Sequence, residues 1–537
     1  MYSYGHASRA VGAANRLRDD VCPFSGLCVT CVESCIGLCE VGLSAIRGPE
    51  VLYPMPFGNV TAGSQKNYPV HWGDFTILGT AAGAKGLPAD SDVATFPNVK
   101  IDVHLGAKNG NKGIACRLPV TVPGLGSTDI ARKHWPGLAA GAALTGIPVT
   151  VGENVVGMDE EARLQDGRVV ESPALTQRVQ DYKAWQTDGW GGIIVQENVE
   201  DSRLGVLEYA IRELGVESVE LKWGQGAKNI GGEVKIANLE KAQMLKKRGY
   251  IVLPDPEDPR VVEAFHAKIF REFERHSRLG MVTEEGFAKR VNQVRKAGAK
   301  HVFLKTGSYR YEDLARALAF CSKYGVDVLT IDASGGGTGM SPWRMMNEWG
   351  IPPVELFSKA WEYARRLDEA GKHVPDLVFA GGFTLEDHIF KGLALGAPYV
   401  KAIGMARAPL TACTASSALW HRINVELDES LTEKFGREKE EVFRGSIYLQ
   451  QTLPKERFDQ VPVSGLGVYT YLSRLAQGLR QLMAGARKFM LEDGDARPDR
   501  GDLTALTRQA AEISGIPFVM EHDQEKAEEI LGGALRA

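Results

Sequence analysis

The sequence has no large excess of either charge and no long hydrophobic run. Its 537 residues include 63 basic and 67 acidic side chains, which gives a net charge of −4. Without a basic stripe, nothing favours nucleic acid or an acidic membrane as a partner, and a small molecule is the expected ligand. No apolar stretch reaches about 18 residues, and the N-terminus lacks the apolar core of a signal peptide. We therefore expect a cytoplasmic protein without a membrane span.

Internal repeats and low-complexity tracts are also absent. Hydrophobic residues make up 44% of the chain and charged residues 24%, so disordered and fibrous architectures are excluded. Glycine is the residue in excess, with 60 copies spread along the chain, and it predicts many tight loops. The length allows about three folding units, although one α/β barrel can take half of it.

Cysteine is scarce outside one short segment, because five of the eight cysteines lie between Cys22 and Cys39. In a reducing compartment this density favours a metal or redox site over disulfides. The spacing is ferredoxin-like without matching the usual ferredoxin run. It predicts a [4Fe–4S] cluster on Cys28, Cys31, Cys35 and Cys39, with Cys22 spare. A structural zinc ion and buried or disulfide-linked thiols are the alternatives.

From about residue 70 onward, short β-branched runs alternate with amphipathic stretches, which is typical of βα units around a parallel sheet. Eight runs have the number and total length of a (β/α)8 TIM barrel, and an open doubly wound sheet is the alternative. The eight expected strands are Pro119–Val122, Ile147–Val151, Gly192–Gln196, Ser218–Leu221, His301–Lys305, Val328–Ile331, Leu377–Ala380 and Tyr399–Ile403. A ninth run, Ile251–Leu253, is interpreted as an excursion from the barrel.

Apolar residues at helical spacing predict helices between these strands. The expected helices are Gly205–Leu214, Asp258–Arg275, Thr283–Ala297, Tyr311–Tyr324, Pro353–Ala370 and Leu385–Leu395. After about His421 the strand pattern fades, and charged, Leu-rich segments predict further helices. The fold class is therefore α/β, with three parts. They are an N-terminal arm and Cys-rich iron–sulfur segment at 1–70, the barrel at 71–420 and a helical C-terminal region at 421–537.

Glycine-rich turns follow several expected strands at their carboxyl ends, where a barrel builds its active site. Backbone amides in such turns can approach a planar ring or a phosphate without obstruction by a Cβ atom. The last two strands each end in such a turn, and barrels commonly hold a phosphate there. This pattern predicts an FMN-type cofactor, and the alternative is that the glycines only shape tight turns. The segments are Gly336-Gly337-Thr338-Gly339, Gly381-Gly382 and Gly404-Met405.

Lysines at two strand ends are candidates for binding a cofactor or a substrate. Lys305 ends a buried apolar strand, so it faces the barrel mouth at a desolvation cost unless it meets an anion. A reduced flavin or a substrate carboxylate would serve, and a lysine that extends to the rim is the alternative. Lys222, Gln225 and Lys228 concentrate donors at the end of another strand, and they suit an acidic, amide-bearing or carbonyl substrate.

Several of these segments resemble motifs of a known family. Residues 222–228, K-W-G-Q-G-A-K, are similar to the K-x-x-Q-G-A-K motif of the FMN-binding domain of glutamate synthase. Residues 336–342, G-G-T-G-M-S-P, are similar to its G-G-T-G-x-S-P motif. Residues 150–153 resemble the family's T-G-E turn, and the likeness covers about residues 120–413 with order and spacing in agreement.

The resemblance implies a flavin-dependent (β/α)8 barrel that reduces 2-iminoglutarate, formed from 2-oxoglutarate and ammonia, to glutamate. The resemblance thus implies an oxidoreductase of the kind that acts on CH–NH2 donors. The implied catalytic residues are Lys305, Gln225, Lys228 and Glu153. The implied cofactor-binding residues are Gly124, Ser127, Lys222, Lys305, Gly336, Gly337, Thr338, Gly339, Gly381, Gly382, Gly404 and Met405.

The chain also departs from the family. No glutaminase domain is expected before the barrel, so ammonia would come from elsewhere. Of the family's three cluster cysteines after the last barrel strand, only Cys413 is present, and their [3Fe–4S] cluster is not expected. The N-terminal cysteines would then take electrons from ferredoxin or another donor protein and pass them to FMN. We expect a homo-oligomer.

Two other functions stay open from the sequence. An electron-transfer or regulatory flavoprotein subunit of a larger redox complex would keep the barrel without forming glutamate. A barrel like that of IMP dehydrogenase also has Gly-rich phosphate turns, but it needs a catalytic cysteine in a strand-end loop. Cys321 lies in an expected helix and Cys413 lies past the last strand, which disfavours this second alternative.

Overall fold

The computed structural model describes residues 68–88, 90–107, 112–187, 189–224, 233–334, 336 and 341–536. The four expected cluster cysteines, Gln225, Lys228 and residues 337–339 lie outside the described residues. In the described part, no helix is long and apolar enough to cross a membrane.

Eight parallel strands close into a barrel in the order β13-β14-β15-β16-β4-β5-β8-β9. Their bounds are β4 Val120–Leu125, β5 Val149–Val151, β8 Ile193–Glu197, β9 Ser218–Lys222, β13 His301–Thr306, β14 Val328–Asp332, β15 Asp376–Ala380 and β16 Val400–Gly404. These are the eight expected strands, so the TIM-barrel prediction is confirmed. Because all eight run in parallel, their carboxyl ends open at one end of the barrel, which we call the mouth.

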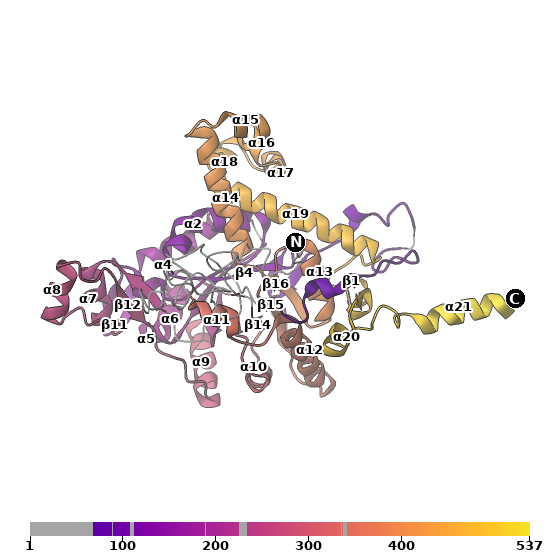
Figure 1. Cartoon of the computed structure of the whole chain (residues 1–537), viewed down its shortest axis with the longest axis horizontal. Helices are drawn as coiled ribbons and strands as arrows, with labels where there is room; N and C mark the ends of the chain where they lie inside the picture. Colours follow the sequence, from indigo (N-terminus) through magenta and orange to yellow (C-terminus); the bar gives the residue numbers. More distant parts are fainter. Residues whose placement is uncertain are drawn as a thin grey trace, which may run out of the picture.

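Helices follow the barrel strands and cover the outside of the barrel (Figure 1). Their bounds are α2 Asp129–Thr145, α3 Val155–Met158, α4 Pro173–Lys183, α5 Val199–Leu204, α6 Val206–Arg212, α9 Glu284–Ala297, α10 Tyr311–Tyr324, α11 Trp343–Glu348, α12 Pro353–Glu369, α13 Glu386–Leu395 and α14 Arg407–Asn424. Helix α9 shows why the sequence predicted them: the Thr283 side chain caps its first turn, and Gly298 ends it in the left-handed conformation with φ 115°. Phe287, Val291 and Val294 form its buried face.

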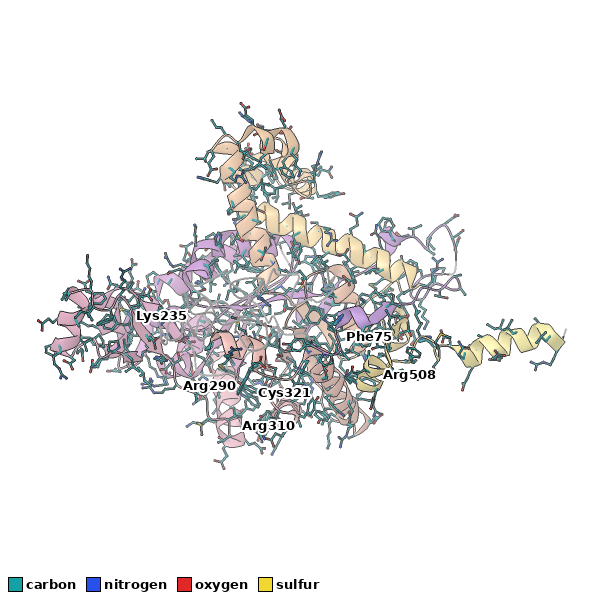
Figure 2. All side chains as sticks on the ribbon, viewed as in Figure 1. Phe75, Lys235, Arg290, Arg310, Cys321 and Arg508 are labelled. Carbon is teal, nitrogen blue, oxygen red and sulfur yellow. The ribbon has the colours of Figure 1, made fainter. Side chains whose placement is uncertain are left out.

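Between β9 and β13 the chain forms an inserted unit, which lies at the left of Figure 1, with Lys235 labelled in Figure 2. Its elements are β10 Glu233–Ile236, α7 Leu239–Lys247, β11 Ile251–Leu253, α8 Pro259–His266 and β12 Phe273–His276. The three strands form an antiparallel sheet in the order β10-β12-β11. The interpretation of β11 as an excursion from the barrel is therefore confirmed.

The helix expected over Asp258–Arg275 is wrong in its second half. Helix α8 ends at His266, and Lys268 has a positive φ of 58°, which turns the chain. Phe270 and Phe273 lie near helical spacing in the sequence, but they pack against each other with ring centroids 5.2 Å apart in the core of the inserted unit. An apolar pattern that mimics a helix thus serves a short strand and the turn before it.

The C-terminal region is helical, as expected, apart from one short strand. Its elements are α15 Glu429–Phe435, α16 Lys439–Val442, α17 Ser446–Thr452, α18 Lys455–Asp459, α19 Val463–Gly485, β17 Leu503–Ala505, α20 Arg508–Ser514 and α21 Gln524–Arg536. Helix α19 packs on α2 and α14, and its buried side chains belong to the same hydrophobic core as the barrel. Helices α15–α18 project from the body, and α21 extends away from it (Figure 1).

The remaining strands are short pairs outside the barrel. Strand β1, Phe75–Ile77, pairs antiparallel with β17 and joins the start of the described chain to its C-terminal region. The pairs β2–β3 and β6–β7 are small antiparallel ribbons, with β2 Val103–Leu105, β3 Ile114–Cys116, β6 Arg163–Gln165 and β7 Arg168–Glu171.

Candidate active site

Three neighbouring strands bring charged and polar side chains together at the barrel mouth. Glu220 and Lys222 alternate on β9, Lys305 lies on β13, and Thr330 and Asp332 alternate on β14. Residues two apart on a strand face the same side, so these side chains gather inside the barrel. Lys305 and Lys222 are also directly opposite each other in the β9–β13 register.

Lys305 has a partner inside the protein. Its Nζ lies 3.2 Å from Asp332 Oδ2, and the two side chains are 5% and 13% exposed. Burial alone would lower the pKa of Lys305, but Asp332, Glu220 and Glu153 outweigh it and raise that pKa. The lysine is therefore cationic at neutral pH. The sequence analysis expected a ligand to provide its anionic partner, but the carboxylate of Asp332, on the neighbouring strand, already does so.

Glu153 and Lys222 form a second ion pair at the mouth. Lys222 Nζ donates to Glu153 Oε1 at 2.6 Å. Burial would raise the pKa of Glu153, but the charge and hydrogen bond of Lys222 outweigh it and lower the pKa to about 2. The structure thus brings together two residues that the sequence placed on different strand ends, one implied as catalytic and one as cofactor-binding.

Backbone contact between two turns fixes the position of Glu153. The amide of Gly152 donates to the Leu125 carbonyl oxygen at 2.9 Å. A Cβ atom on Gly152 would lie 2.6 Å from the Gly126 nitrogen, and one on Gly126 would lie 2.6 Å from the Glu153 carbonyl oxygen. Only glycine allows these turns to touch, so the turn after β5 is held directly against the turn after β4.

The sequence analysis missed several residues at the mouth, among them Gln196 on β8 and Glu220 on β9. Gln196 Nε2 donates to Glu220 Oε1 at 2.5 Å, and Thr330 Oγ1 donates to Glu220 Oε2 at 3.3 Å. Gln196 Oε1 is buried and has no hydrogen-bond partner among the described residues. A Cβ atom on Gly124 would lie 2.8 Å from that oxygen and 3.1 Å from both the carbon and the nitrogen of the same amide, so the amide packs against the backbone of this glycine.

The sequence did contain a signal for these residues. Gln196 follows the apolar run Ile193–Val195 on β8, and Glu220 stands between the buried Val219 and Leu221 on β9. A polar side chain in such a strand needs a partner, and a partner is most readily found inside the barrel. Neither residue belongs to a motif of matching length, which is why motif comparison did not select them.

The glycine-rich turns after β14 and β15 lie against each other. A Cβ atom on Gly336 would lie 2.5 Å from Asp332 Oδ1 and 3.4 Å from the Gly381 Cα. Gly381 and Gly382 have φ values of 110° and 89°, which only glycine adopts readily. Their positions fit a backbone turn that can present amides at the mouth.

Gly404 and Met405 are tied into the barrel wall. A Cβ atom on Gly404 would lie 2.8 Å from the Ala380 Cβ and 2.9 Å from the Pro123 Cγ, so close packing explains this glycine. The Met405 amide donates to the Thr121 carbonyl oxygen at 2.9 Å, and its side chain is buried. Ser127 follows β4, one residue before Thr128, the cap of α2.

Charged groups of both signs lie at the mouth among the described residues. Arg407 opens α14 beside Asp332, and burial lowers its pKa to about 10 although Asp332 acts in the opposite direction. It therefore stays cationic at neutral pH. Three cations, Lys222, Lys305 and Arg407, face three carboxyl groups, Glu153, Glu220 and Asp332.

The cysteines of the described part do not form a metal site. In the residues that the structure describes, no group of three or more His, Cys, Asp or Glu side chains could hold a metal ion. Cys413 is buried, its thiol donates to the His134 carbonyl oxygen at 3.4 Å, and burial raises its pKa to about 11. Cys321 is buried within α10, away from any strand-end loop, as the sequence predicted.

Part of the chain is similar to a known protein family. Residues 276–420 match the family described as the conserved region in glutamate synthase. The resemblance to glutamate synthase is confirmed. The matched region contains Lys305, Asp332 and the turns at Gly381 and Gly404, while Glu153 and Lys222 lie before it.

Relatives with glutamate synthase names match different shares of the chain. A glutamate synthase large subunit-like protein of Rhizobium meliloti is 23% identical over 468 residues, which cover 85% of this chain and 89% of that protein. The archaeal-type glutamate synthase [NADPH] of Dehalococcoides mccartyi is 28% identical over 232 residues, 39% of this chain and 41% of the relative. The chain thus spans most of the first relative and less than half of the second.

Solved structures of similar arrangement were also found. A lactate oxidase of Pediococcus acidilactici has a TM-score of 0.41 and 11% identity, covering 80% of this chain and 83% of its own. A soluble mutant of the (S)-mandelate dehydrogenase of Pseudomonas putida has a TM-score of 0.41 and 13% identity, with 80% and 88% covered. At these scores the likenesses add nothing to the fold assignment, which rests on the strand pairing.

Proposed function

We propose that the chain is an FMN-dependent oxidoreductase of the glutamate synthase type that reduces a small 2-oxo or imino acid. The observation that carries this proposal is the barrel mouth, where buried Lys305 pairs with Asp332 and partly buried Lys222 pairs with Glu153. Gln196 adds a buried acceptor with no hydrogen-bond partner among the described residues. The match of residues 276–420 to the conserved glutamate synthase region supports it.

The residues at the mouth fit an isoalloxazine ring. Gly124 carries no Cβ, which lets the Gln196 amide lie against its backbone, and Gln196 Oε1 is a buried acceptor without a partner among the described residues. Lys305 supplies a buried cation, and the positive-φ turn at Gly381 and Gly382 suits a phosphate. Bound FMN would supply a carrier that takes electrons and delivers a hydride to the substrate.

The chain's own residues would then position the substrate and neutralise the charges of the substrate and the cofactor. Lys222 ends β9 and Glu153 follows β5, and a 2-oxo acid carboxylate could replace part of the lysine's contact with Glu153. Gln225 and Lys228 follow Lys222 in the sequence and would line the substrate side. Lys305 would stabilise negative charge that develops on the reduced cofactor, with Asp332 holding it in place.

Electrons would come through the N-terminal cysteines, Cys28, Cys31, Cys35 and Cys39, from ferredoxin or another donor protein. A contact at the start of the described chain supports this route: the Tyr68 hydroxyl lies 2.7 Å from Ser334 Oγ, directly after β14. Tyr68 is buried, so the chain reaches the barrel at the mouth and not at its opposite end.

The test is anaerobic purification of the full chain followed by cofactor extraction and reoxidation of the reduced protein. We expect FMN, and we expect 2-oxoglutarate plus ammonia to reoxidise the reduced protein. Reoxidation by protein partners alone would favour the electron-transfer subunit instead. Recovery of FAD or of no flavin after reconstitution would contradict the proposal.

A second arm of the test addresses the cluster. Cys31→Ser with Cys35→Ser should abolish iron binding and donor-linked reduction, while FMN stays bound and reducible by dithionite. Cys413→Ser is the matched control, because that thiol is buried among helices and should leave the iron content unchanged. Iron retained in the double variant would contradict the ligand assignment.

A further inference from the structure

The residue after Glu153 is held from two sides. Asn154 is buried and left-handed, with φ 64°, a conformation that is unfavourable for residues other than glycine and least so for Asn and Asp. Its backbone amide donates to the buried Asp201 Oδ2 at 2.9 Å, and its side-chain Oδ1 accepts from the Tyr250 hydroxyl at 3.1 Å. Asp201 is itself held by its capping box with Asn198 at the start of α5. The two contacts fix Asn154 and, through the peptide bond, the backbone of Glu153.

The Tyr250 contact comes from the inserted unit. Tyr250 directly precedes β11, belongs to the hydrophobic core of that unit and is 4% exposed. A Cβ atom on Gly157 would lie 1.8 Å from its hydroxyl oxygen, so a glycine in α3 lets the tyrosine lie against this helix. Two residues earlier, Arg248 donates to the carbonyl oxygens of Gly157 and Asp159 at 2.9 and 2.6 Å. The inserted unit is thus fastened to the short helix that begins two residues after Glu153.

We propose that Tyr250 is a positioning residue for Glu153, through which the inserted unit sets the affinity for the substrate carboxylate. Lys222 Nζ carries three donors, and Glu153 takes one of them at 2.6 Å, so the place of Glu153 determines where the ammonium group lies. A substrate carboxylate at the mouth meets that ammonium group. The inference rests on the proposed function and deepens it, because it assigns control of substrate binding to a residue outside the barrel.

The test compares Tyr250→Phe with Tyr182→Phe in the full-length holoprotein. Both tyrosines are buried, and the Tyr182 hydroxyl donates to the Ile147 carbonyl oxygen at 2.8 Å, just before the opposite end of β5. In Tyr250→Phe, the KM for 2-oxoglutarate should rise about three- to tenfold, with kcat within about twofold of the wild type, because binding and not the chemical step is affected. In Tyr182→Phe, both constants should stay within about twofold of the wild type. An equal rise of KM in both variants, or no rise in Tyr250→Phe, would overturn the positioning role.

A second pair of variants tests whether the conformation of Asn154 carries the effect. Asn154→Gly adopts the left-handed conformation freely, whereas Asn154→Ala opposes it. The KM should stay within about threefold of the wild type in the glycine variant and rise about tenfold or more in the alanine variant. Adding Tyr250→Phe to Asn154→Gly should raise the KM no further, because the acceptor of the hydroxyl is already gone. A rise equal to that of Tyr250→Phe alone would contradict the route through Asn154.

The surroundings of Glu153 also allow a measurement without substrate. Lys222 and Lys305 lower the pKa of Glu153, and the Glu153 charge acts in turn on Asp201 and Arg275. Burial raises the pKa of Asp201 to about 7, so in the folded chain this carboxyl group is already protonated below pH 5. In the folded chain, the group of this cluster that titrates between pH 5 and pH 2 is therefore Glu153.

This measurement separates the inference from the proposed function. Because a displaced Glu153 pairs less well with its lysine, Tyr250→Phe should reduce the decline in unfolding free energy between pH 5 and pH 2, and Tyr182→Phe should not. If the decline is reduced in Tyr250→Phe alone but the wild type does not turn over 2-oxoglutarate, the proposed function fails while Tyr250 still positions Glu153. An unchanged decline in Tyr250→Phe would overturn the positioning role and leave the proposed function standing.

Discussion

Two charge clusters lie on opposite faces of one barrel strand. On β8, Gln196 faces the inside of the barrel and its neighbour Glu197 faces the outside. The outer cluster joins Glu197 to Arg290 of α9, labelled in Figure 2, and to Glu208 of α6. The inner cluster joins Gln196 to Glu220, with Lys305 close by.

The outer cluster is saturated, while the inner one is not. Arg290 holds both Glu197 oxygens at 2.6 and 2.7 Å and both Glu208 oxygens at 2.5 and 3.0 Å. Inside, the acceptor of Gln196 lacks a donor among the described residues. A buried network complete in itself holds the fold, whereas one that leaves a buried atom unsatisfied calls for a further explanation, such as a ligand.

The largest effect is expected from breaking the outer cluster. Arg290→Met leaves the buried Glu197 carboxylate without its cation, which should cost about 3–5 kcal/mol of unfolding free energy. Urea unfolding measures this loss. The FMN affinity of the folded variant should stay within about twofold of the wild type, because Arg290 does not reach the mouth. A tenfold drop in affinity would show that the two clusters are not separate.

The next effect is a pH dependence from the Glu153–Lys222 pair. The pKa of Glu153 is lowered from 4.5 to about 2 in the folded chain, so the pair stabilises the fold by about 3 kcal/mol at most. This contribution is complete above about pH 5 and is lost as the pH falls through 4.5 toward 2. Unfolding free energies measured across this range should decline in the wild type.

The control for this pH dependence is Lys222→Met. Without the lysine charge, the folded pKa of Glu153 is no longer depressed, and burial raises it instead. The decline in stability between pH 5 and pH 2 should then be smaller by at least this amount. An equal decline in both proteins would assign the acid sensitivity to other carboxyl groups.

A smaller effect is expected for Lys305→Met, which should lower the free energy of unfolding by about 2 kcal/mol. The loss is limited because Arg407 remains beside Asp332 and still offsets the negative charge of its carboxylate. The same change should lower the reduction potential of the bound flavin, by about 30 mV for each 1.4 kcal/mol of lost preference for the reduced form. A spectroelectrochemical titration measures the potential. An unchanged potential would leave Lys305 with only a structural role.

The smallest effect on stability is expected for Gly124→Ala. The added Cβ meets only the end of the Gln196 side chain, so the apoprotein should lose less than about 1 kcal/mol. FMN affinity should nevertheless fall at least about tenfold, because the added Cβ displaces the Gln196 amide from its position at the mouth. Gly494→Ala, with no atom within 4 Å of its new Cβ, is the matched control.

The barrel could be predicted from the sequence because its strands are buried on both faces. Runs such as Val328–Ile331 are mostly apolar or β-branched, and turns or helices bound them, so each strand could be found without its partners. The inserted unit was less predictable. Phe270 and Phe273 belong to a small core whose strands are short, and spacing alone could not separate that core from a helix.

The candidate site was predictable only where a motif carried it. Lys305, Lys222 and Glu153 stood at strand ends, but their pairing depends on the order in which the barrel closes. From the sequence, Lys305 lacked an anion. The structure supplies Asp332, which lies 27 positions later in the chain. Gln196 and Glu220 could be recognised as site residues only from their contact with each other. This contact joins two strands, so the sequence of either strand alone does not reveal it.

The pairing of β1 with β17 has a consequence for the synthesis of the chain. Phe75 lies opposite Ala505, so the two strands leave the ribosome more than four hundred residues apart. Strand β1 therefore waits unpaired while the whole barrel is translated, and it gains its partner only when synthesis is nearly complete. A premature stop before Leu503 would release a chain in which the barrel is complete but β1 has no strand to pair with. Chaperones bind intermediates with such an unpaired strand, and proteases degrade them.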